Sequence, residues 1–552
     1  MKIINDNFIF LPLGGSSEIG MNANLYHYQS SWILIDLGIS FADETMPGVD
    51  ILLPDIEFIE RRKDNLEAII LTHGHEDHMG AIQYLWDKLR VPIYGSPFTI
   101  ALLKRKLKET GMLNEVSLFT FEKSKSFELG PFKIEPIWLT HSIPDPISFA
   151  ISTKVGTVYH SGDWKFDSSP QIGSLCEIES LKRISKNGIL AFIGDSTNSM
   201  VEGNTKSEKD AYQNIFSVLS KSQGRVFVTC FASNVARIKS IITASDKCGK
   251  KVVLAGRSLH RVMEAASEVG YLSDLPDTLS LKEIDKIPHD KLVVIAAGSQ
   301  GEIRSTMTRI SNGNHELIKV KPGDTAIFSS SKIPGNELAI SRVHNSFMQK
   351  GVKVITDDDE LIHVSGHPGR DDMKKMYDIL NPQISIPVHG TAKHISMHSE
   401  LAYECGVSLS IEPENGSIIN LSGNSPGVIG QIKTNASVPD GNQIIKSDSN
   451  VFSLRRKMLW NGAITIVIVL DQNNEFLPPL KISQNGVVET SFEIDFLDEI
   501  KLEIEELIEL MPKKSLIDDY AIEDKIRRSV RKVAKIIVDR KPIIDIHIVR
   551  TY

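Results

Sequence analysis

Cysteine is scarce in this chain, and that scarcity limits the chemistry open to the protein. The 552 residues include four cysteines, which are widely scattered and form no C-x-x-C pair. We therefore expect neither a disulfide scaffold nor a thiolate metal site. The four thiols are expected to be buried; they are Cys176, Cys230, Cys248 and Cys405.

Long apolar runs and an excess of positive charge are missing as well. No run approaches the roughly 18 to 20 apolar residues that cross a bilayer, and residues 1–10 lack the pattern of a signal peptide. We therefore expect a cytoplasmic protein without a membrane partner. The formal net charge of −8 argues against a surface that binds polyphosphate everywhere. A nucleic-acid enzyme needs only a local positive groove, and bound divalent metals can supply much of that field.

The remaining composition is that of a folded, globular protein with several domains. Hydrophobic residues make up 41% of the chain and charged residues 24%. Its length exceeds what one hydrophobic core usually supports. Two apolar strands followed by one helical face are typical of an α/β fold. These segments are Ser31 to Asp36, Glu67 to Thr72, and the face formed by Met79, Ile82, Leu85, Trp86 and Leu89.

A second series of buried strands lies between about residues 206 and 356. Each strand ends in a turn of small or polar residues, as expected of parallel strands whose carboxyl ends bind a ligand at one edge of the sheet. The strands are Val226 to Thr229, Val252 to Ala255, Leu292 to Ala297 and Thr325 to Phe328. After about Gly423 a polar stretch predicts a linker, and the strand Ala463 to Leu470 and the helix Asp495 to Leu510 predict a separate small domain.

The densest chemical motif is Thr72-His73-Gly74-His75-Glu76-Asp77-His78-Met79-Gly80, which follows a predicted strand and opens a predicted helix. Its two closely spaced imidazoles can hold one ion, while the carboxylate and imidazole that follow can turn toward a second ion. Nitrogen and oxygen ligands suit zinc or manganese. The alternative is a surface loop rich in histidine and aspartate.

Two ions need more ligands than this turn supplies. His141, Asp163 and His389 follow predicted strands and can complete the site. For any one of them alone, a hydrogen-bonded histidine or a turn-forming aspartate is an equally good interpretation.

Further motifs extend over nearly the whole chain. They are Gly14-Gly15-Ser16-Ser17-Glu18-Ile19-Gly20, Asp36, Thr140-His141-Ser142-Ile143-Pro144-Asp145, Gly194-Asp195-Ser196-Thr197-Asn198, His363-Val364-Ser365-Gly366-His367, and His389. Together with the metal motif they resemble the metallo-β-lactamase superfamily and, within it, the β-CASP nucleases, most closely the ribonuclease J family.

The resemblance implies an α/β protein: a metallo-β-lactamase αββα sandwich with an inserted β-CASP α/β domain and a small C-terminal α+β domain. The expected boundaries are 1–205 for the first part of the metallo-β-lactamase domain, 206–355 for the β-CASP domain, 356–424 for the completion of the metallo-β-lactamase domain, 425–455 for a linker and 456–552 for the C-terminal domain.

The resemblance also implies the ligand set and the cofactors. One ion would be held by His73, His75 and His141, the other by Asp77, His78 and His389, with Asp163 bridging both. The cofactors expected are two Zn²⁺ per subunit, with Mn²⁺ or Mg²⁺ as alternatives. A structural Ca²⁺ is a further expectation, near Gly48, Asp50 and Asp448. Relatives with histidine at the position of His389 act on RNA, whereas Thr391 departs from the glutamate that relatives often carry there.

By the same resemblance the chain is expected to be a metal-dependent ribonuclease, a 5′-to-3′ exonuclease with endonuclease activity in RNA processing and mRNA decay. Asp77 or Asp163 would orient the attacking water, Asp195 is the acidic motif, and His367 would stabilise phosphoryl oxygens or protonate the departing 3′ oxygen. The expected partner is single-stranded RNA, preferably 5′-monophosphorylated, and the expected assembly is a homodimer or homotetramer.

A 5′-phosphate pocket is expected at the segment His363, Val364, Ser365, Gly366 and His367, together with Ser233 and Asn234, for which helix capping is the alternative. The basic runs at residues 104–108 and 527–535 would either contact RNA or be solvated. Two rival functions stay open: a small-molecule metallohydrolase, and a catalytically silent RNA-binding scaffold.

Overall fold

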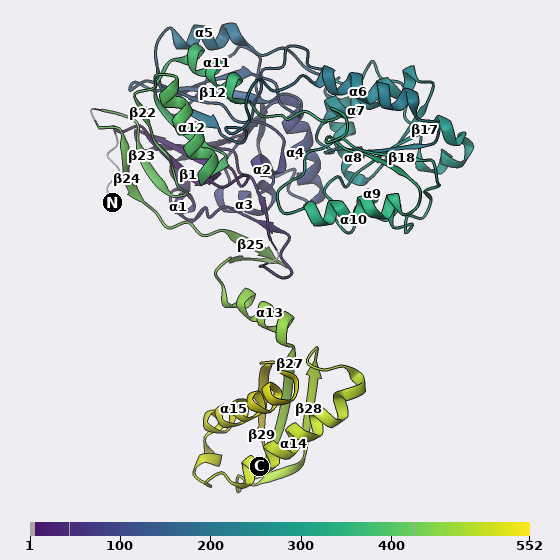
Figure 1. Ribbon diagram of the computed structural model, residues 1–552. Helices are drawn as coiled ribbons and strands as arrows, with labels where there is room; N and C mark the ends of the chain where they lie inside the picture. Colours follow the sequence, from purple (N-terminus) through teal and green to yellow (C-terminus); the bar gives the residue numbers. More distant parts are fainter. Residues whose placement is uncertain (1–5, 44, 424, 552) are drawn as a thin grey trace. The chain divides into compact units, whose positions relative to one another are not determined.

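The computed structural model describes residues 6–43, 45–423 and 425–551 (Figure 1). The chain divides into two compact units. Unit 1 holds the described residues up to Phe41 and Ile51–Pro439, and unit 2 holds Ala42–Asp50 and the described residues from Asp440 onward. Among the residues described, no helix is both long and apolar enough to span a membrane.

Unit 1 contains two mixed sheets that share one core. The first sheet comprises β1 (Ile9–Gly14), β3 (Ala23–Tyr28), β4 (Ser31–Ile35), β7 (Leu66–Ile70), β8 (Ile93–Gly95), β9 (Leu118–Thr120), β23 (Ser417–Asn420) and β24 (Gly427–Gln431), in the order β24-β23-β1-β3-β4-β7-β8-β9. The second comprises β10 (Phe127–Leu129), β11 (Phe132–Trp138), β12 (Ile147–Ser152), β13 (Thr157–His160), β14 (Ile189–Asp195), β20 (Pro382–Val388) and β22 (Leu409–Ser410), in the order β10-β11-β12-β13-β14-β20-β22.

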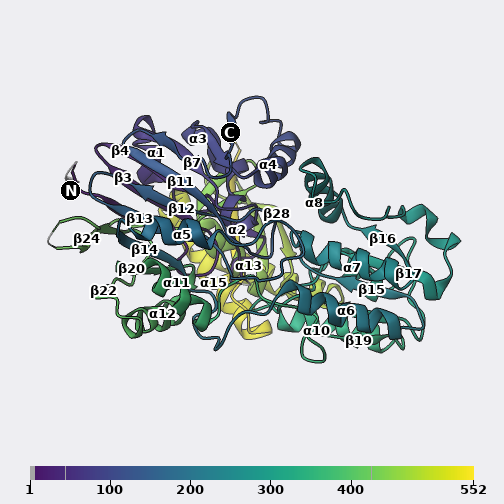
Figure 2. The same cartoon turned by 90° about the horizontal axis from the view of Figure 1, so that it is seen from above.

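Apolar side chains from both sheets fill the space between them, and helices cover the outer faces. Phe10, Ile33, Phe149 and Ile386 are fully buried in this core. The helices α3 (Ile82–Leu89) and α4 (Pro97–Glu109) pack against the first sheet. The second sheet is covered by α5 (Ile178–Ser185), α11 (Arg370–Leu380) and α12 (Ala392–Glu404), which Figure 2 shows grouped along β14 and β20. The expected αββα sandwich is confirmed.

Between β14 and β20 the chain forms a third sheet, which is wholly parallel. It comprises β15 (Val226–Thr229), β16 (Lys251–Ala255), β17 (Leu292–Ala296), β18 (Thr325–Phe328) and β19 (Lys353–Ile355), in the order β16-β17-β15-β18-β19. One face packs against α6 (Glu208–Lys221) and α7 (Val235–Lys247), the other against α9 (Thr306–Ser311) and α10 (Glu337–Met348) (Figure 1). Burial on both faces explains why these strands are continuous apolar runs.

Unit 2 is a small α+β domain, as expected. Its sheet has the order β28-β27-β29, with β27 (Ala463–Leu470), β28 (Phe476–Asn485) and β29 (Ile543–Arg550). Alternate residues of β27 are buried, as a half-covered strand requires. They share a core with α14 (Glu493–Glu509) and α15 (Asp519–Val538). The helix α13 (Asn450–Asn461) precedes the sheet.

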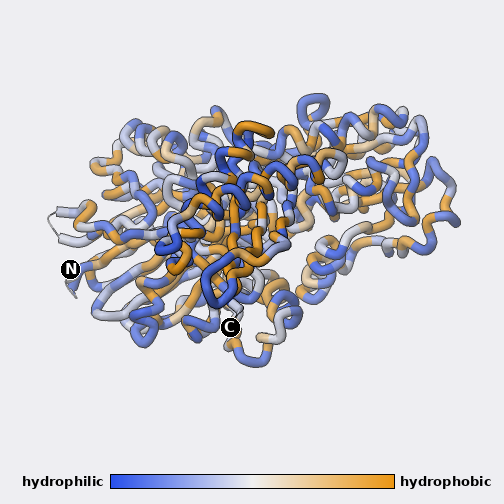
Figure 3. The backbone as a smooth tube through the Cα atoms, turned by 90° about the horizontal axis from the view of Figure 1, so that it is seen from below, coloured by the Kyte–Doolittle hydropathy of each residue, from blue (hydrophilic) through white to orange (hydrophobic). Residues whose placement is uncertain are grey.

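The predicted strands lie where the sequence placed them, apart from one or two residues at their ends. The predicted helical face from Met79 to Leu89 is divided between α2 (Glu76–Met79) and α3, and the stretch predicted to be a linker contains β24, β25 (Ser437–Asp440) and β26 (Gln443–Lys446). Figure 3 shows apolar segments gathered in the interior, and many outer turns are hydrophilic. The cysteine prediction was only partly right: Cys230 is buried, but Cys176, Cys248 and Cys405 are partly exposed. The domain boundaries themselves stay predictions, and the boundary at 424 falls on a position that is not described.

The core between the two sheets of unit 1 should dominate its stability. Replacing fully buried Phe149 by alanine leaves a cavity and should lower the free energy of unfolding by about 3 to 5 kcal/mol. Urea unfolding followed by circular dichroism measures the loss. Leu338→Ala is the control, because this α10 side chain is 74% exposed and its removal should change stability by no more than about 0.5 kcal/mol. Equal losses in the two variants would contradict this assignment of the core.

Candidate metal centre

The histidine motif is held by backbone hydrogen bonds to the loop that follows β4. Leu37 N donates to His78 O at 2.8 Å, and Ile39 N donates to Glu76 O at 3.0 Å. Gly38 lies between these two donors, and a Cβ there would stand 1.7 Å from Asp77 O. A larger residue cannot fit, so this glycine sets how closely the short helix α2 (Glu76–Met79) approaches the first sheet.

Four side chains converge on a first position. His75 Nδ1 lies 2.9 Å from His73 Nε2 and 3.1 Å from His141 Nε2. Asp163 Oδ2 lies 3.8 Å from His73 Nε2 and 3.7 Å from His141 Nε2. One ligand atom from each side chain lies within 4.8 Å of the others, so this group can share one ion.

A second position uses the other half of the motif. His78 Nε2 lies 3.2 Å from Asp163 Oδ2, and Asp77 Oδ2 lies 3.2 Å from His389 Nε2. These four side chains again offer ligand atoms within 4.8 Å of one another. Asp163 belongs to both groups. The structure therefore brings together all seven predicted ligands, with one carboxylate shared in the manner of a two-metal site.

Three of the imidazoles have an outer partner at Nδ1. His78 Nδ1 donates to Asp36 Oδ2 at 2.7 Å, and His141 Nδ1 donates to Gly366 O at 2.6 Å. Thr197 Oγ1 lies 2.8 Å from His389 Nδ1. Such outer partners fix the tautomer and leave the remaining nitrogen for a metal.

The charges at the first position match what a divalent cation requires. Burial lowers the pKa of His75 to about 4 and also lowers the pKa values of His73 and His141, so all three rings are neutral at pH 7. Burial acts to raise the pKa values of Asp77 and Asp163, but the neighbouring imidazoles outweigh it and lower both.

Burial opposes protonation of His78 and His389, but the neighbouring carboxylates outweigh it and raise the pKa values of both rings, that of His389 to about 10. A cation at the second position would therefore displace protons from these two rings, because zinc binds neutral imidazoles and ionised carboxylates. The nitrogen and oxygen donors of both groups are of the kind that zinc takes.

His367 and Asp195 stand beside the two clusters. His367 Nδ1 lies 2.8 Å from Asp195 Oδ2 and 3.9 Å from Asp163 Oδ2. Asp195 ends β14, while His389 follows β20, and these strands pair in parallel with Asp195 opposite Val388. The pairing places motif residues nearly two hundred positions apart at one edge of the sheet.

The predicted phosphate segment lies against the same cluster. Ser365 Oγ accepts from Asn198 Nδ2 at 2.9 Å and from His367 N at 3.2 Å. Gly366 must be a glycine, because a Cβ would lie 2.5 Å from His141 Nδ1. Val364 is buried. These contacts fix the segment and leave the Ser365 hydroxyl hydrogen available to an acceptor.

The remaining predicted residues have other contacts. Asn234 caps α7, and its Oδ1 accepts from Arg237 N at 2.9 Å, as the alternative interpretation holds. Ser233 precedes it and is partly exposed, and the capping side chain that accepts from the helix is that of Asn234. Their role in a phosphate pocket stays a prediction. The calcium site at Gly48, Asp50 and Asp448 also stays a prediction: in the described ranges, the groups of acidic and histidine side chains that can share an ion do not include these aspartates.

Several side chains of the basic runs are paired within the protein. Lys106 is buried and donates to Glu76 Oε2 at 2.5 Å, while Arg105 Nη1 donates to Glu268 Oε2 at 2.7 Å. On α15, Arg528 Nη2 lies 2.8 Å from Asp524 Oδ2. These side chains have partners without RNA.

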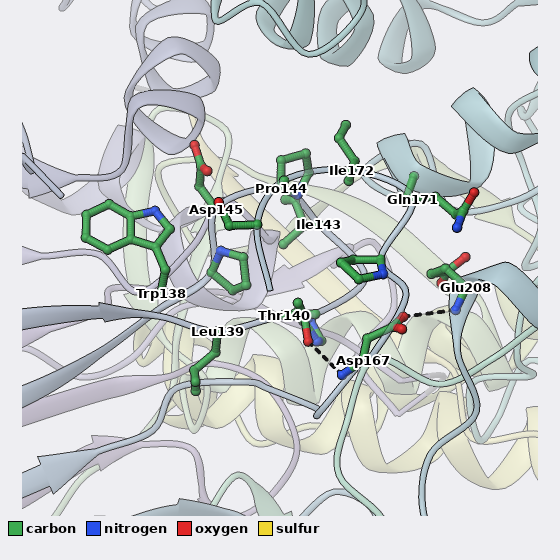
Figure 4. Close-up of a pocket in the computed structure, with 16 residues that line it drawn as sticks. Trp138, Leu139, Thr140, Ile143, Pro144, Asp145, Asp167, Gln171, Ile172 and Glu208 are labelled. Carbon is green, nitrogen blue, oxygen red and sulfur yellow. Dashed lines mark hydrogen bonds between the residues drawn. The ribbon is translucent and has the colours of Figure 1, made fainter. Parts of the chain in front are cut away.

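A hollow lies beside the first cluster and includes His141 in its wall (Figure 4). Figure 4 shows Pro144 and Ile172 on one side of the hollow and Asp167 and Glu208 on another. Glu208 N donates a hydrogen bond to Asp167 Oδ2 at 2.9 Å. The hollow therefore borders both the metal-binding loops and the start of the parallel-sheet domain.

Several residues that shape the site were not assigned a role from the sequence. Gly38, Thr197 and Asn198 each fix a motif residue, and two of them stand inside the motif that ends at Asn198. Asp36 follows β4 and was noted only as part of the resemblance; its carboxylate also accepts from Thr72 N at 2.8 Å. A polar residue directly after a buried strand was the signal that pointed to it.

The fold and the seven gathered ligands define a hydrolase of the metallo-β-lactamase class with an inserted β-CASP domain. Four family models match: "Beta-lactamase superfamily domain" at residues 31–178, "Ribonuclease J, beta-CASP domain" at 223–347, "Zn-dependent metallo-hydrolase RNA specificity domain" at 351–410 and "Ribonuclease J C-terminal domain" at 451–551. The chain belongs to the ribonuclease J family.

Relatives match over most of their length. Ribonuclease J of Sinorhizobium meliloti is 36% identical, over 99% of this chain and 98% of its own. Ribonuclease J2 of Bacillus subtilis is 33% identical, over 86% of this chain and 85% of its own. A solved structure of a protein of unknown function from Enterococcus faecalis aligns with a TM-score of 0.53 and 16% identity, over 75% of this chain and all of that one, which shows the fold alone.

Removing one ligand should remove metal while preserving the fold. Asp77→Ala or His75→Ala should weaken metal affinity by more than the roughly 10- to 100-fold that loss of an outer partner costs. Metal content after gel filtration and the circular dichroism spectrum measure the two effects. Glu76→Gln is the matched control, because Glu76 lies between these residues and outside both clusters. Retention of two ions by Asp77→Ala would exclude Asp77 as a metal ligand.

Proposed function

We propose that this protein is a zinc-dependent ribonuclease that hydrolyses phosphodiester bonds. The observation that carries the proposal is the pair of ligand groups that share Asp163, because these residues would hold two cations close together, and such pairs of cations serve many phosphodiesterases. Membership of the ribonuclease J family supports RNA as the substrate. Manganese and magnesium are the alternative metals.

The bound cations would lower the pKa of water and neutralise the charge of the scissile phosphate. The protein's own groups position the reactants. Asp77 and Asp163 stay ionised and can accept a hydrogen bond from the attacking water. Asp195 holds His367 by Nδ1, which leaves the Nε2 of that ring to contact a phosphoryl oxygen or to protonate the departing 3′ oxygen.

The segment His363–His367 supports selection of the 5′ end. The Ser365 oxygen already accepts two hydrogen bonds, so its hydroxyl hydrogen can donate to a terminal phosphate. We therefore propose 5′-to-3′ exonuclease action on single-stranded, 5′-monophosphorylated RNA, together with internal cleavage, in RNA processing and mRNA decay. The cytoplasmic location and the homodimer or homotetramer stay predictions.

The substrate class can be tested directly. Under matched metal and salt, single-stranded RNA should be cleaved faster than DNA of the same sequence, and a chromogenic lactam should be left intact. Gel analysis of labelled strands and absorbance measure the rates, with Asp77→Ala as the inactive control. Hydrolysis of the lactam alone would favour the small-molecule hydrolase, and RNA binding without cleavage would favour the silent scaffold.

The end selectivity can be tested at Ser365. RNA with a 5′ monophosphate should be degraded faster than RNA with a triphosphate or hydroxyl end, because a hydroxyl end leaves pocket donors unpaired at a cost of roughly 1 to 3 kcal/mol. Ser365→Leu should suppress 5′-to-3′ degradation more than internal cleavage, whereas His367→Ala should depress both. A 5′-labelled RNA separates the two activities. If Ser365→Leu degrades all three RNAs like the parent, the segment is not the phosphate pocket.

A further inference from the structure

Arg237, in the first turn of α7, is fully buried and carries its charge into the interior of unit 1. Its Nε donates to Glu208 Oε2 at 3.0 Å, and its Nη2 donates to Glu208 Oε1 at 3.0 Å and Oε2 at 2.9 Å. This is a two-pronged pair that a lysine cannot reproduce. Because a buried charge without its partner is strongly destabilising, the two side chains must stay together.

The third nitrogen of Arg237 grips the chain where it leaves the parallel-sheet domain. Nη1 donates to Ile362 O at 2.9 Å and to Ser329 Oγ at 2.6 Å, and Ser329 Oγ itself donates to Ile362 O at 2.6 Å. His363 follows, and four residues beyond Ile362 lies Gly366, whose carbonyl orients His141. Arg237 therefore anchors the start of the segment that contacts the metal cluster.

Glu208 fixes the segment in which the chain enters that domain. Glu208 N donates to Asp167 Oδ2 at 2.9 Å, and Ser207 Oγ donates to Asp167 Oδ1 at 2.6 Å. Asp167 N donates in turn to Thr140 Oγ1 at 3.1 Å, beside the ligand His141. Figure 4 shows Thr140, Asp167 and Glu208 in this sequence of contacts.

We propose that Arg237 is a positioning residue for the reaction. It joins Glu208, where the chain enters the parallel-sheet domain, to Ile362, where the chain leaves it, and so holds the His363–His367 segment in place beside the metal-binding loops. The inference rests on the proposed ribonuclease activity for its catalytic readout. It extends that function to a residue that contacts neither a predicted metal ligand nor the scissile group. A displacement of about 1 Å at His367 can reduce turnover about 100-fold, so the hydrogen bonds of Arg237 have a large effect on the rate.

The same domain offers a matched control. Arg225 Nη2 lies 3.0 Å from Asp324 Oδ2, and both side chains are nearly inaccessible. This pair is nearly as buried as Arg237 and Glu208, but the other hydrogen bond of Arg225, from Nη2, goes to Lys319 O and not to the segments in which the chain enters and leaves the domain. Its disruption should lower stability without moving the His363–His367 segment.

The experiment compares Arg237→Lys and Arg225→Lys in the full-length, metal-loaded protein. Both should unfold at lower urea than the parent. Only Arg237→Lys should speed hydrogen–deuterium exchange of the amides in residues 362–367, and only Arg237→Lys should lower turnover of saturating RNA, by at least about tenfold, with unchanged metal content. Arg225→Lys should keep turnover within about twofold of the parent.

Ser329→Ala provides a second, milder variant should Arg237→Lys not fold. It removes one acceptor of Arg237 and the hydroxyl bond to Ile362 O, so exchange in residues 362–367 should rise and turnover should fall about threefold. Equal loss of turnover in both lysine variants, or parent-like exchange in Arg237→Lys and Ser329→Ala, would overturn the proposal. A parent protein that cleaves no RNA would refute the proposed function instead. The hydrogen–deuterium exchange of residues 362–367 would still test whether Arg237 holds that segment.

Discussion

A single buried carboxylate, that of Asp163, is the interaction on which the site depends. It lies within 4 Å of imidazole nitrogens of His73, His78 and His141, and it also contacts His389. These side chains come from distant loops. The charge of Asp163 acts most on His78 and His389, because it raises the pKa values of both rings against the effect of their burial. The two sheets of unit 1 carry those loops at their strand ends and so bring them to one carboxylate.

The sequence predicted the part of the site whose geometry is local. The spacing from His73 to His78, between a strand and a helix, determines where those side chains point, and the apolar runs determine the strands that carry His141, Asp163 and His389. The parallel sheet was also predictable, because strands buried on both faces leave unbroken apolar segments.

Contacts across large sequence separations were not predictable in the same way. Thr197 meets His389 across 192 positions, and Gly366 meets His141 across 225. Threonine and glycine are common, so neither residue type signals its role. The backbone φ angles of Asp36 and His389 are 63° and 55°, values that residues other than glycine rarely adopt. No local sequence pattern predicts such backbone strain. Tertiary packing alone decides these details.

The pairing of β14 with β20 has a consequence for synthesis on the ribosome. These strands are neighbours in the sheet, but the whole parallel-sheet domain is translated between them. At about 5 to 20 residues per second, the edge of β14 waits roughly 10 to 40 s for its partner. During that interval an open strand edge is available for wrong pairing. The nascent chain thus completes its last ligand, His389, only after an entire domain has had time to fold.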